Sequence, residues 1–211
     1  MTGAQGQVGQ VLSQDLSADY ELLNNTRVGE SVWDFDVCRG AAWQNAAAGW
    51  RDGLDGVIHT VGAFHYGPLE AMDDALWRQV ISTNLDAAFY AYKHTVEALR
   101  KRRGSLIFFT LAGLQHTRPE PHAAAYAAAK TALTSLAQSI ADIEAKHGVR
   151  CNMIAPGLLH NESPTTVQRY RVPLGRAAKR SELCAAVRYL LGESAAQVTG
   201  VTLPLSGGWR L

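Results

Sequence analysis

Tyr126 and Lys130 are the residues of this chain whose types and spacing could do chemistry together. They stand four residues apart in Tyr126-Ala-Ala-Ala-Lys130. If the segment is helical, the phenol and the ammonium lie on one face. A phenol with an ordinary pKa near ~10 is a poor acid and base at neutral pH, and a fixed neighbouring cation favours its ionised form. The pair could therefore exchange a proton with a substrate, although the same spacing also occurs in ordinary amphipathic helices.

A glycine-rich segment at the start of the chain could hold a phosphate group. Thr2-Gly3-Ala4-Gln5-Gly6-Gln7-Val8-Gly9 places Gly3, Gly6 and Gly9 at every third position ahead of a helical pattern. Glycines there let backbone N–H groups approach a pyrophosphate at the N-terminus of a helix. Such a loop normally follows a strand, yet only Met1 precedes it here. We therefore expect the natural chain to start upstream, with the first strand of the sheet missing from this chain.

Short apolar runs alternate with helical patterns along the rest of the sequence. This alternation is typical of an α/β fold, in which helices cover a doubly wound parallel sheet. Strands are predicted at Gly56–Val61, Ser105–Thr110, Val149–Ile154 and Val201–Leu205, and helices at Leu76–Lys101, Pro121–His147 and Ser181–Leu191. Because no repeat, low-complexity segment or linker marks a boundary, residues 1–211 are predicted to form a single domain.

Two further apolar runs, Tyr20–Asn24 and Ser31–Phe35, also have the composition of strands. About six residues separate them, whereas a parallel crossover needs about ten or more. A helix has therefore been lost between them. Either one of the two runs is not a regular strand, or the first ends early and the second enters the sheet at an edge.

The composition argues against several classes of function. The chain has 20 basic and 19 acidic side chains, a net charge of +1, which creates no field for gathering nucleic acid or anionic lipid. It has no apolar run of about 18 residues and no signal peptide, so we expect no membrane association. Cys38, Cys151 and Cys184 are widely spaced and the histidines lack ligand spacing, which predicts no disulfide, no metal site and a cytoplasmic location.

Taken together, the motifs of this chain resemble those of the short-chain dehydrogenase/reductase family, in order and spacing, over nearly the whole length. The resemblance implies a Rossmann-like fold and an oxidoreductase that uses NAD(P)(H). The motifs are the glycine loop, Asp36-Val37, His59-Thr60-Val61-Gly62, Asn84, Tyr126-x3-Lys130, Ile154-Ala155-Pro156-Gly157 and Gly207-Gly208-Trp209.

The resemblance implies a catalytic role for four residues. Tyr126 would protonate the carbonyl oxygen during reduction, and Lys130 would lower the pKa of Tyr126 and hold the nicotinamide ribose. Asn84 would keep a water near the lysine and extend a proton relay. Thr110 stands where the family usually has a serine, and its hydroxyl would orient the substrate oxygen. The extra methyl of threonine restricts its rotamer and narrows the site.

The cofactor-binding residues are implied in the same way. Asp36 would hydrogen-bond the adenine amino group, with Val37 against the ring, and Pro156 and Gly157 would border the nicotinamide. His59 and Thr60 depart from the family's usual asparagines, and a structural role is expected for His59. The full predicted set is Gly3, Gly6, Gly9, Arg27, Asp36, Val37, Val61, Gly62, Tyr126, Lys130, Pro156 and Gly157.

The preferred cofactor depends on the end of the second strand, where a carboxylate would bind the ribose 2′-hydroxyl and a cation would bind a 2′-phosphate. The sequence there is Asn24-Asn25-Thr26-Arg27. Because no carboxylate is present and Arg27 is available, NADP(H) is favoured over NAD(H). Arg27 could also be an ordinary solvated cation of the loop.

The segment from about 157 to 176 would form the substrate lid, by the same resemblance. It contains His160, Asn161, Glu162 and Ser163, and His116, Arg118 and His122 precede the helix of Tyr126. These polar residues favour a small polar substrate. Partial likenesses to dihydropteridine and pteridine reductases and to 3-oxoacyl-carrier-protein reductases leave a carbonyl and a pterin-like imine both open.

A second class of function stays open beside the enzyme: a non-catalytic, family-like nucleotide-binding or scaffolding protein. The absent first strand, the threonine at 110 and the replaced asparagines at 59 and 60 suggest it, whereas the combination of Tyr126, Lys130 and Asn84 argues against it. By the resemblance, a homodimer or homotetramer is expected through the two long helices.

Overall fold

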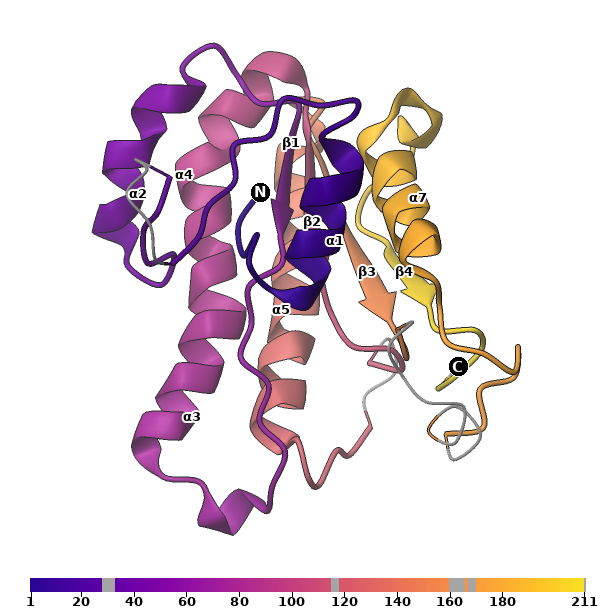
Figure 1. Cartoon of the computed structure of the whole chain (residues 1–211). Coiled ribbons are helices and arrows are strands. Elements are labelled where there is room, and N and C mark those ends of the chain that lie inside the picture. The colour runs from indigo at the N-terminus through magenta and orange to yellow at the C-terminus, as the bar shows by residue number, and fades with distance from the viewer. Residues whose placement is uncertain (28–32, 115–117, 160–165, 167–169, 211) are drawn as a thin grey trace.

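A four-stranded parallel sheet forms the centre of the structure, a computed structural model that describes residues 1–27, 33–114, 118–159, 166 and 170–210 (Figure 1). The strands lie in the order β1-β2-β3-β4, and every neighbouring pair is parallel. Their bounds are β1 Gly56–His59, β2 Ser105–Phe109, β3 Arg150–Pro156 and β4 Thr202–Leu205. All four predicted strands are confirmed, with ends that differ by one or two residues.

Strands β1, β2 and β3 are buried on both faces of the sheet, which explains why they read as nearly continuous apolar runs, whereas β4 at the edge is partly exposed. Leu106 and Phe108 of β2 pack into one apolar cluster, whereas Ile107 and Phe109 of the same strand belong to a different one. Successive side chains of a strand point to opposite faces. Each face of the sheet therefore has its own layer of core.

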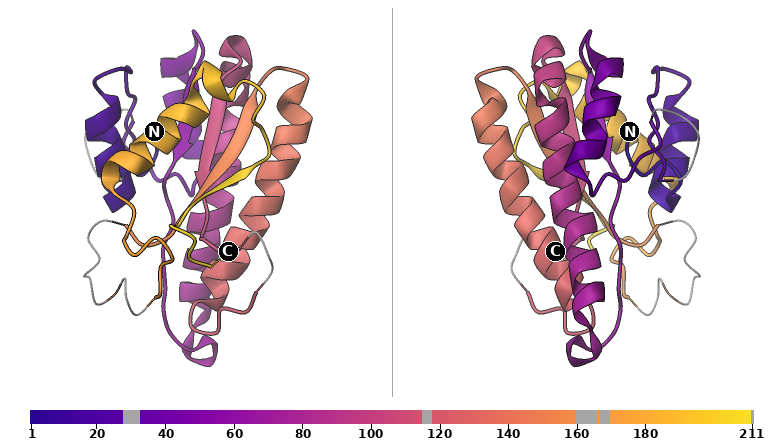
Figure 2. Two further views of the ribbon diagram at one scale, coloured as in Figure 1. Left: turned by 90° about the vertical axis from the view of Figure 1, so that its right-hand side faces the viewer. Right: turned by 90° about the vertical axis from the view of Figure 1, so that its left-hand side faces the viewer.

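Helices cover both faces, as Figure 2 shows. On one face α1 (Gln7–Leu16) packs beside α7 (Arg180–Leu191), and on the other lie α4 (Ala87–Arg102) and α5 (Ala124–Ala145). Parallel strands joined by helices on both sides make this a doubly wound, Rossmann-like α/β fold, which confirms the predicted fold class. Short helical segments complete the chain: α2 Gly40–Ala46, η1 Ala47–Trp50, η2 Leu69–Ala71 and η4 Glu193–Ala195.

The long helix predicted at Leu76–Lys101 is interrupted. It begins as α3 (Asp74–Ile81), where the Asp73 carboxylate caps the helix by accepting from the Leu76 N–H at 2.7 Å. A π-helical turn, η3 (Ser82–Asp86), then separates α3 from α4. Such turns widen a helix by one residue and are frequent at functional sites. This one contains Asn84.

The part of the fold before β1 departs from the prediction. Tyr20–Asn24 is not a regular strand; in this region Asn25 and Thr2 form isolated parallel bridges, and Thr2 bridges in turn to His59. Backbone hydrogen bonds join this segment to the first residues of the chain: the Asn25 N–H donates to the Met1 carbonyl at 2.8 Å, and the Ala4 N–H donates to the Asn25 carbonyl at 3.1 Å. Residues 33–35 are also outside any strand, and residues 31 and 32 of the predicted run lie outside the described residues.

Side-chain hydrogen bonds replace a strand ladder in this segment. The Asn25 amide donates to the Trp33 and Phe35 carbonyls at 2.5 and 3.2 Å. The Asp34 carboxylate accepts from the Thr26 N–H at 3.2 Å and from the Thr26 hydroxyl. The short connection between residues 25 and 35 is thus held by local bonds, which supports the first of the two alternatives predicted for it.

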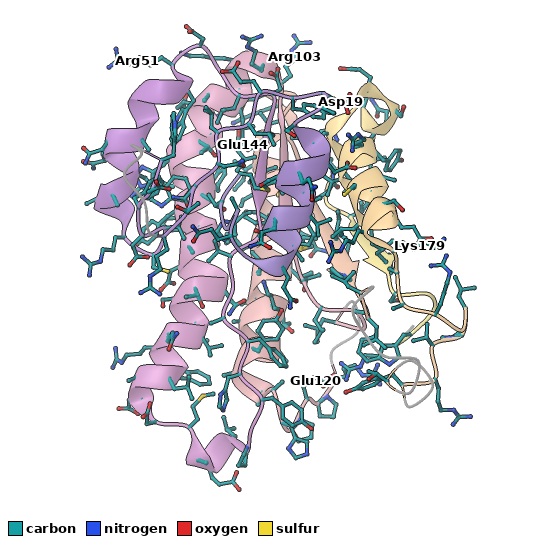
Figure 3. The ribbon with its side chains drawn as sticks, viewed as in Figure 1. Asp19, Arg51, Arg103, Glu120, Glu144 and Lys179 are labelled. Atoms are coloured by element: carbon teal, nitrogen blue, oxygen red, sulfur yellow. The ribbon has the colours of Figure 1, made fainter. Side chains whose placement is uncertain are left out.

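One ion pair joins the two long helices. Glu144 of α5, labelled in Figure 3, is fully buried. Its carboxylate accepts from Arg100 at two nitrogens, both at 2.7 Å, and from the Tyr92 hydroxyl at 2.7 Å. These bonds hold the pKa of Glu144 below its usual value, with the Arg100 hydrogen bonds as the main cause. A paired and hydrogen-bonded carboxylate can stay charged in such a position.

Candidate functional site

Tyr126 and Lys130 lie near the start of α5 and form the centre of the candidate site. The Lys130 Nζ is 5.5 Å from the centroid of the Tyr126 ring, as the predicted helical spacing requires. Only 4% of Lys130 is exposed, and its ammonium donates to the Phe109 carbonyl at 2.8 Å. This bond holds the lysine at the carboxyl end of β2.

Burial changes the proton affinity of both groups. It raises the pKa of Tyr126 to about 12 and lowers the pKa of Lys130 to about 8. The raised pKa of Tyr126 runs against the expectation that Lys130 lowers it, because in this geometry the burial of the phenol dominates. At neutral pH the phenol is therefore protonated, which is the state that a proton donor needs.

Asn84 is held rigidly beside the lysine. Its amide nitrogen donates to the Ala63 carbonyl at 2.8 Å and the Val80 carbonyl at 2.9 Å, and the residue is fully buried. Its Oδ1 has no hydrogen-bond partner in the described part of the chain. A Cβ on Gly62 would overlap this Oδ1 and come within 3.3 Å of the Lys130 Nζ. Asn84 and Lys130 therefore meet on one side of Gly62.

Thr110 directly follows β2, one residue after the carbonyl that Lys130 binds. Its N–H donates to the Ile154 carbonyl at 2.9 Å, which fixes the backbone. Its hydroxyl is buried, and the described residues offer it no partner. A buried hydroxyl without a partner is costly and can serve an oxygen of a bound molecule.

A cavity of about 820 Å³ lies beside these residues. Seven of the predicted cofactor residues line it: Gly3, Gly6, Arg27, Asp36, Val37, Val61 and Gly62. The volume is in the range of sites that take a cofactor-sized ligand. Since Gly62 lines the cavity and also contacts Asn84 and Lys130, the cavity and the tyrosine–lysine pair are neighbours.

The glycine loop has the geometry expected of a phosphate-binding turn. Gly3 has a φ of +76°, and a Cβ there would lie 2.6 Å from the Thr60 hydroxyl. Gly9 does not line the cavity; it lies in α1, where a Cβ would overlap the Gly3 carbonyl. The third glycine thus lets the helix pack against the loop, with the N-terminus of α1 next to the cavity.

Pro156 and Gly157 stand apart from the cavity lining. The Gly157 N–H donates to the Leu205 carbonyl at 3.0 Å, and a Cβ on Gly157 would lie 3.3 Å from the Trp209 ring. Trp209 contacts Tyr170 edge to face, with ring centroids 5.4 Å apart. Gly157 therefore packs against Trp209 of the C-terminal segment, which in turn contacts Tyr170 in the described part of the predicted lid.

Asp36 and Val37, which are predicted to contact the adenine, are held by local bonds. The Asp36 carboxylate accepts from the Cys38 N–H at 3.0 Å, and the buried Val37 presents its carbonyl to the Trp43 indole at 3.0 Å. Sequence reasoning missed Arg78 of α3, a second cation that lines the cavity. It also missed Asp34, because only the fold brings this carboxylate to Thr26.

Phe64 was not predicted either. Its ring meets the Tyr126 ring edge to face, with centroids 5.0 Å apart, and 62% of Phe64 is exposed. No spacing in the sequence marks it, since it lies in the irregular segment after β1. His59, by contrast, has the structural place expected of it: it is buried in β1 and bonded to the Thr2 hydroxyl at 2.7 Å.

Several predicted elements fall partly outside the described residues. His116, His160, Asn161, Glu162 and Ser163 lie there, so the predicted lid is described only at Gly157–Leu159, Thr166 and Tyr170–Arg176. In the described ranges, no group of His, Cys, Asp and Glu could hold a metal ion. Nor does any helix within them have the length and apolarity needed to cross a membrane.

Comparison with known proteins identifies the family. A family model described as enoyl-(acyl carrier protein) reductase matches residues 10–210. The chain belongs to the short-chain dehydrogenase/reductase family. This family consists of NAD(P)-dependent oxidoreductases, and the match confirms the resemblance found in the sequence.

Curated members of the short-chain dehydrogenase/reductase family are about 30% identical to this chain over the aligned residues. The 2,3-dihydro-2,3-dihydroxybenzoate dehydrogenase of Escherichia coli is 29% identical, covering 75% of this chain and 70% of its own. The 3-oxoacyl-[acyl-carrier-protein] reductase of the same organism is 32% identical, covering 74% and 66%. Trans-4-hydroxycyclohexanecarboxylate dehydrogenase of Sinomonas cyclohexanicum is 30% identical, covering 95% and 78%.

Solved structures of short-chain dehydrogenases/reductases show the same fold. A short-chain oxidoreductase from Pseudomonas aeruginosa, solved with NADPH and described as having an atypical catalytic centre, is similar with a TM-score of 0.87 and 20% identity, covering 99% of this chain and 94% of its own. A short-chain dehydrogenase from Leptospira borgpetersenii with bound NAD+ has a TM-score of 0.87 and 23% identity, covering 100% and 91%.

Proposed function

We propose that this protein is an NADP(H)-dependent oxidoreductase that reduces a carbonyl group by hydride transfer, with Tyr126 as the general acid. The observation that carries the proposal is the protonated, half-buried phenol of Tyr126, beside Lys130 and next to the cavity at the glycine loop. A nicotinamide bound in that cavity would supply the hydride.

The residues around Tyr126 have complementary roles in this proposal. Tyr126 donates its proton to the substrate oxygen, and the partnerless hydroxyl of Thr110 hydrogen-bonds the same oxygen. Lys130 places a positive charge behind the phenol and favours the phenolate that proton transfer leaves. Asn84 keeps its free Oδ1 beside the lysine, where a water molecule would extend the proton path.

The charges of the cavity support NADP(H) over NAD(H). Arg27 and Arg78 line it together with two carboxylates, Asp36 and Asp86, and a guanidinium suits a 2′-phosphate. Asp34, a carboxylate of the connecting segment, already accepts from the N–H and the hydroxyl of Thr26. A carboxylate committed in this way is a weaker partner for a ribose hydroxyl.

The substrate we propose is a ketone on a small ring, or the corresponding alcohol in the reverse direction. Two of the relatives above are named for ring substrates that carry a carboxylate, dihydroxy-dihydrobenzoate and hydroxycyclohexanecarboxylate. The exposed Phe64 ring, edge-on to Tyr126, offers an apolar surface for the body of such a ring. A pterin-like imine is also a small ring compound and belongs in the same test.

Binding and turnover test the proposal in two steps. NADPH should quench the fluorescence of Trp77, which lines the cavity, and NADPH should be consumed when a ring ketone is added. The substrates to compare are the methyl ester of 4-oxocyclohexanecarboxylate, a 3-oxoacyl thioester and a quinonoid dihydropterin. If neither NADPH nor NADH binds, the proposed enzymatic function is wrong and a non-catalytic protein is favoured.

We also propose a homodimer or homotetramer assembled through α4 and α5, in the cytoplasm. Phe89 of α4 and Ile143 of α5 are apolar yet exposed, at 41% and 50%. Burial of such residues in an interface between subunits stabilises association. Light scattering on the purified protein should give a mass of two or four chains, and a monomer would contradict the assembly.

The cytoplasmic location rests on the cysteines. All three are unpaired, which suits a reducing compartment.

A further inference from the structure

Arg118 is an uncompensated cation at the edge of the candidate site. It belongs to the segment that connects Thr110 to α5, and its Nη1 is 3.2 Å from the position of a Cβ on Gly113. Arg118 is exposed, and no ion pair or hydrogen bond of its guanidinium occurs within the described ranges of the chain. Its charge is therefore available to a ligand.

A neighbouring arginine shows the contrast. The Arg210 side chain also packs against Gly113, but its guanidinium is bonded to both oxygens of Glu120 at 2.5 and 3.2 Å and lies over the Trp209 ring at 4.4 Å. Glu120 thus neutralises Arg210, and no bond joins it to Arg118 in the described part of the chain. Two arginines meet at Gly113, and among the described residues Arg210 has an acidic partner whereas Arg118 has none.

The position of this pair relates it to Tyr126 and Thr110. Gly113 follows Thr110 by three residues, and the Ala112 N–H between them donates to the Pro156 carbonyl at 3.4 Å. Trp209, which precedes Arg210, contacts Gly157 at the end of β3. Figure 3 shows Glu120 at the end of the molecule toward which the strand arrows of Figure 1 point. Thr110 lies at the same end, because it directly follows β2. Ligands of doubly wound folds bind at this edge.

We propose that Arg118 binds a carboxylate on the substrate, away from the carbonyl that is reduced. A guanidinium forms two parallel hydrogen bonds with a carboxylate, so it would select acids over neutral molecules and fix the orientation of the ring. This inference rests on the proposed function and names a chemical class for it: a small cyclic keto acid. The anchor explains why an exposed arginine stands unpaired next to a neutralised one.

The experiment compares one ketone with and without its charge. The substrates are 4-oxocyclohexanecarboxylate and its methyl ester, and the enzymes are the full chain, Arg118→Gln, Arg118→Lys and the control Arg51→Gln. Arg51 is also an exposed arginine, and it lies at the opposite end of the molecule in Figure 3. It reports any general effect of removing one positive charge.

We expect the unaltered protein to prefer the acid. Arg118→Gln should lower kcat/KM for the acid by about 10- to 100-fold, the range for a hydrogen-bonded charge pair, with little change for the ester. Arg118→Lys should recover part of the loss, Arg51→Gln should lose nothing, and salt should raise KM for the acid alone. Equal use of acid and ester by the unaltered protein would overturn the inference but leave the proposed function standing. If the protein reduces neither of these compounds and no other ketone, both the inference and the proposed function are wrong.

Discussion

Gly62 is the position at which the geometry of the site can be tested by adding a single methyl group. A Cβ at this position would overlap the Asn84 Oδ1, lie 3.2 Å from the Asn84 Cγ and lie 3.3 Å from the Lys130 Nζ. The φ of Gly62 is outside the left-handed region, so alanine has no backbone strain there. The effect of Gly62→Ala is therefore the displacement of the Asn84 amide.

The size of the effect follows from the bonds that Asn84 makes. Displacement of its amide breaks the bonds to the Ala63 and Val80 carbonyls, each of which contributes about 1 kcal/mol net. Replacing glycine by alanine gains about 0.4–1 kcal/mol through the unfolded chain. We expect Gly62→Ala to lower the free energy of unfolding by about 1–2 kcal/mol and to lower kcat by about tenfold or more, because Lys130 also shifts.

Urea unfolding followed by tryptophan fluorescence measures the stability, and NADPH consumption measures turnover. Asn84→Ala removes the clash, so Gly62→Ala should cost little in that background, and the two changes should be non-additive. Gly192→Ala is the matched control: its φ is −80°, a Cβ there would meet the Arg188 carbonyl at 3.2 Å but no group of the candidate site, and we expect a smaller change in stability than at Gly62 and no loss of turnover. If Gly62→Ala unfolds and turns over like the unaltered protein, the placement of Asn84 beside Lys130 is wrong.

Three further predictions concern charge. Arg27→Ala should raise KM for NADPH about tenfold and leave KM for NADH unchanged, with Arg51→Ala as the control; equal effects on both cofactors would remove Arg27 from phosphate binding. Burial lowers the pKa of Lys130 to about 8, so kcat/KM should fall as pH rises above about 8, and a flat profile to pH 10 would contradict the need for its charge. Glu144→Ala removes the buried acceptor of Arg100 and Tyr92 and leaves Arg100 with the exposed Glu97, so it should cost about 1–3 kcal/mol in urea unfolding. Glu97→Ala, on the exposed side of Arg100, should cost under about 1 kcal/mol.

The sheet and its long helices could be predicted because their patterns are local. Buried parallel strands such as Ser105–Phe109 are continuous apolar runs, and the residues of α5 repeat every three to four positions. The tyrosine–lysine pair is likewise a local spacing. The interruption of the long helix at Ser82–Asp86 was not predicted, because a π turn depends on how the Asn84 amide bonds across to Ala63 and Val80.

Contacts made only by the fold could not be read from the sequence. Asp34 accepts a hydrogen bond from Thr26, and the neighbouring Asn25 amide donates to the Trp33 carbonyl. No repeat of apolar residues in the sequence predicts these contacts. Phe64 and Arg78 reach the site from an irregular segment and a helix without a motif. The raised pKa of Tyr126 could not be predicted for a related reason: the spacing indicates a nearby lysine but not the burial of the phenol.

The central claim, that Tyr126 donates the proton, is tested most directly by Tyr126→Phe. The change removes one hydroxyl and keeps the ring that Phe64 contacts, and Tyr126 is not among the residues that line the cavity. We predict that NADPH binds the variant with an unchanged Kd while kcat for ketone reduction falls by about 100- to 10,000-fold, the range for general acid catalysis. Turnover of the ketone by Tyr126→Phe at the rate of the unaltered protein would contradict the account.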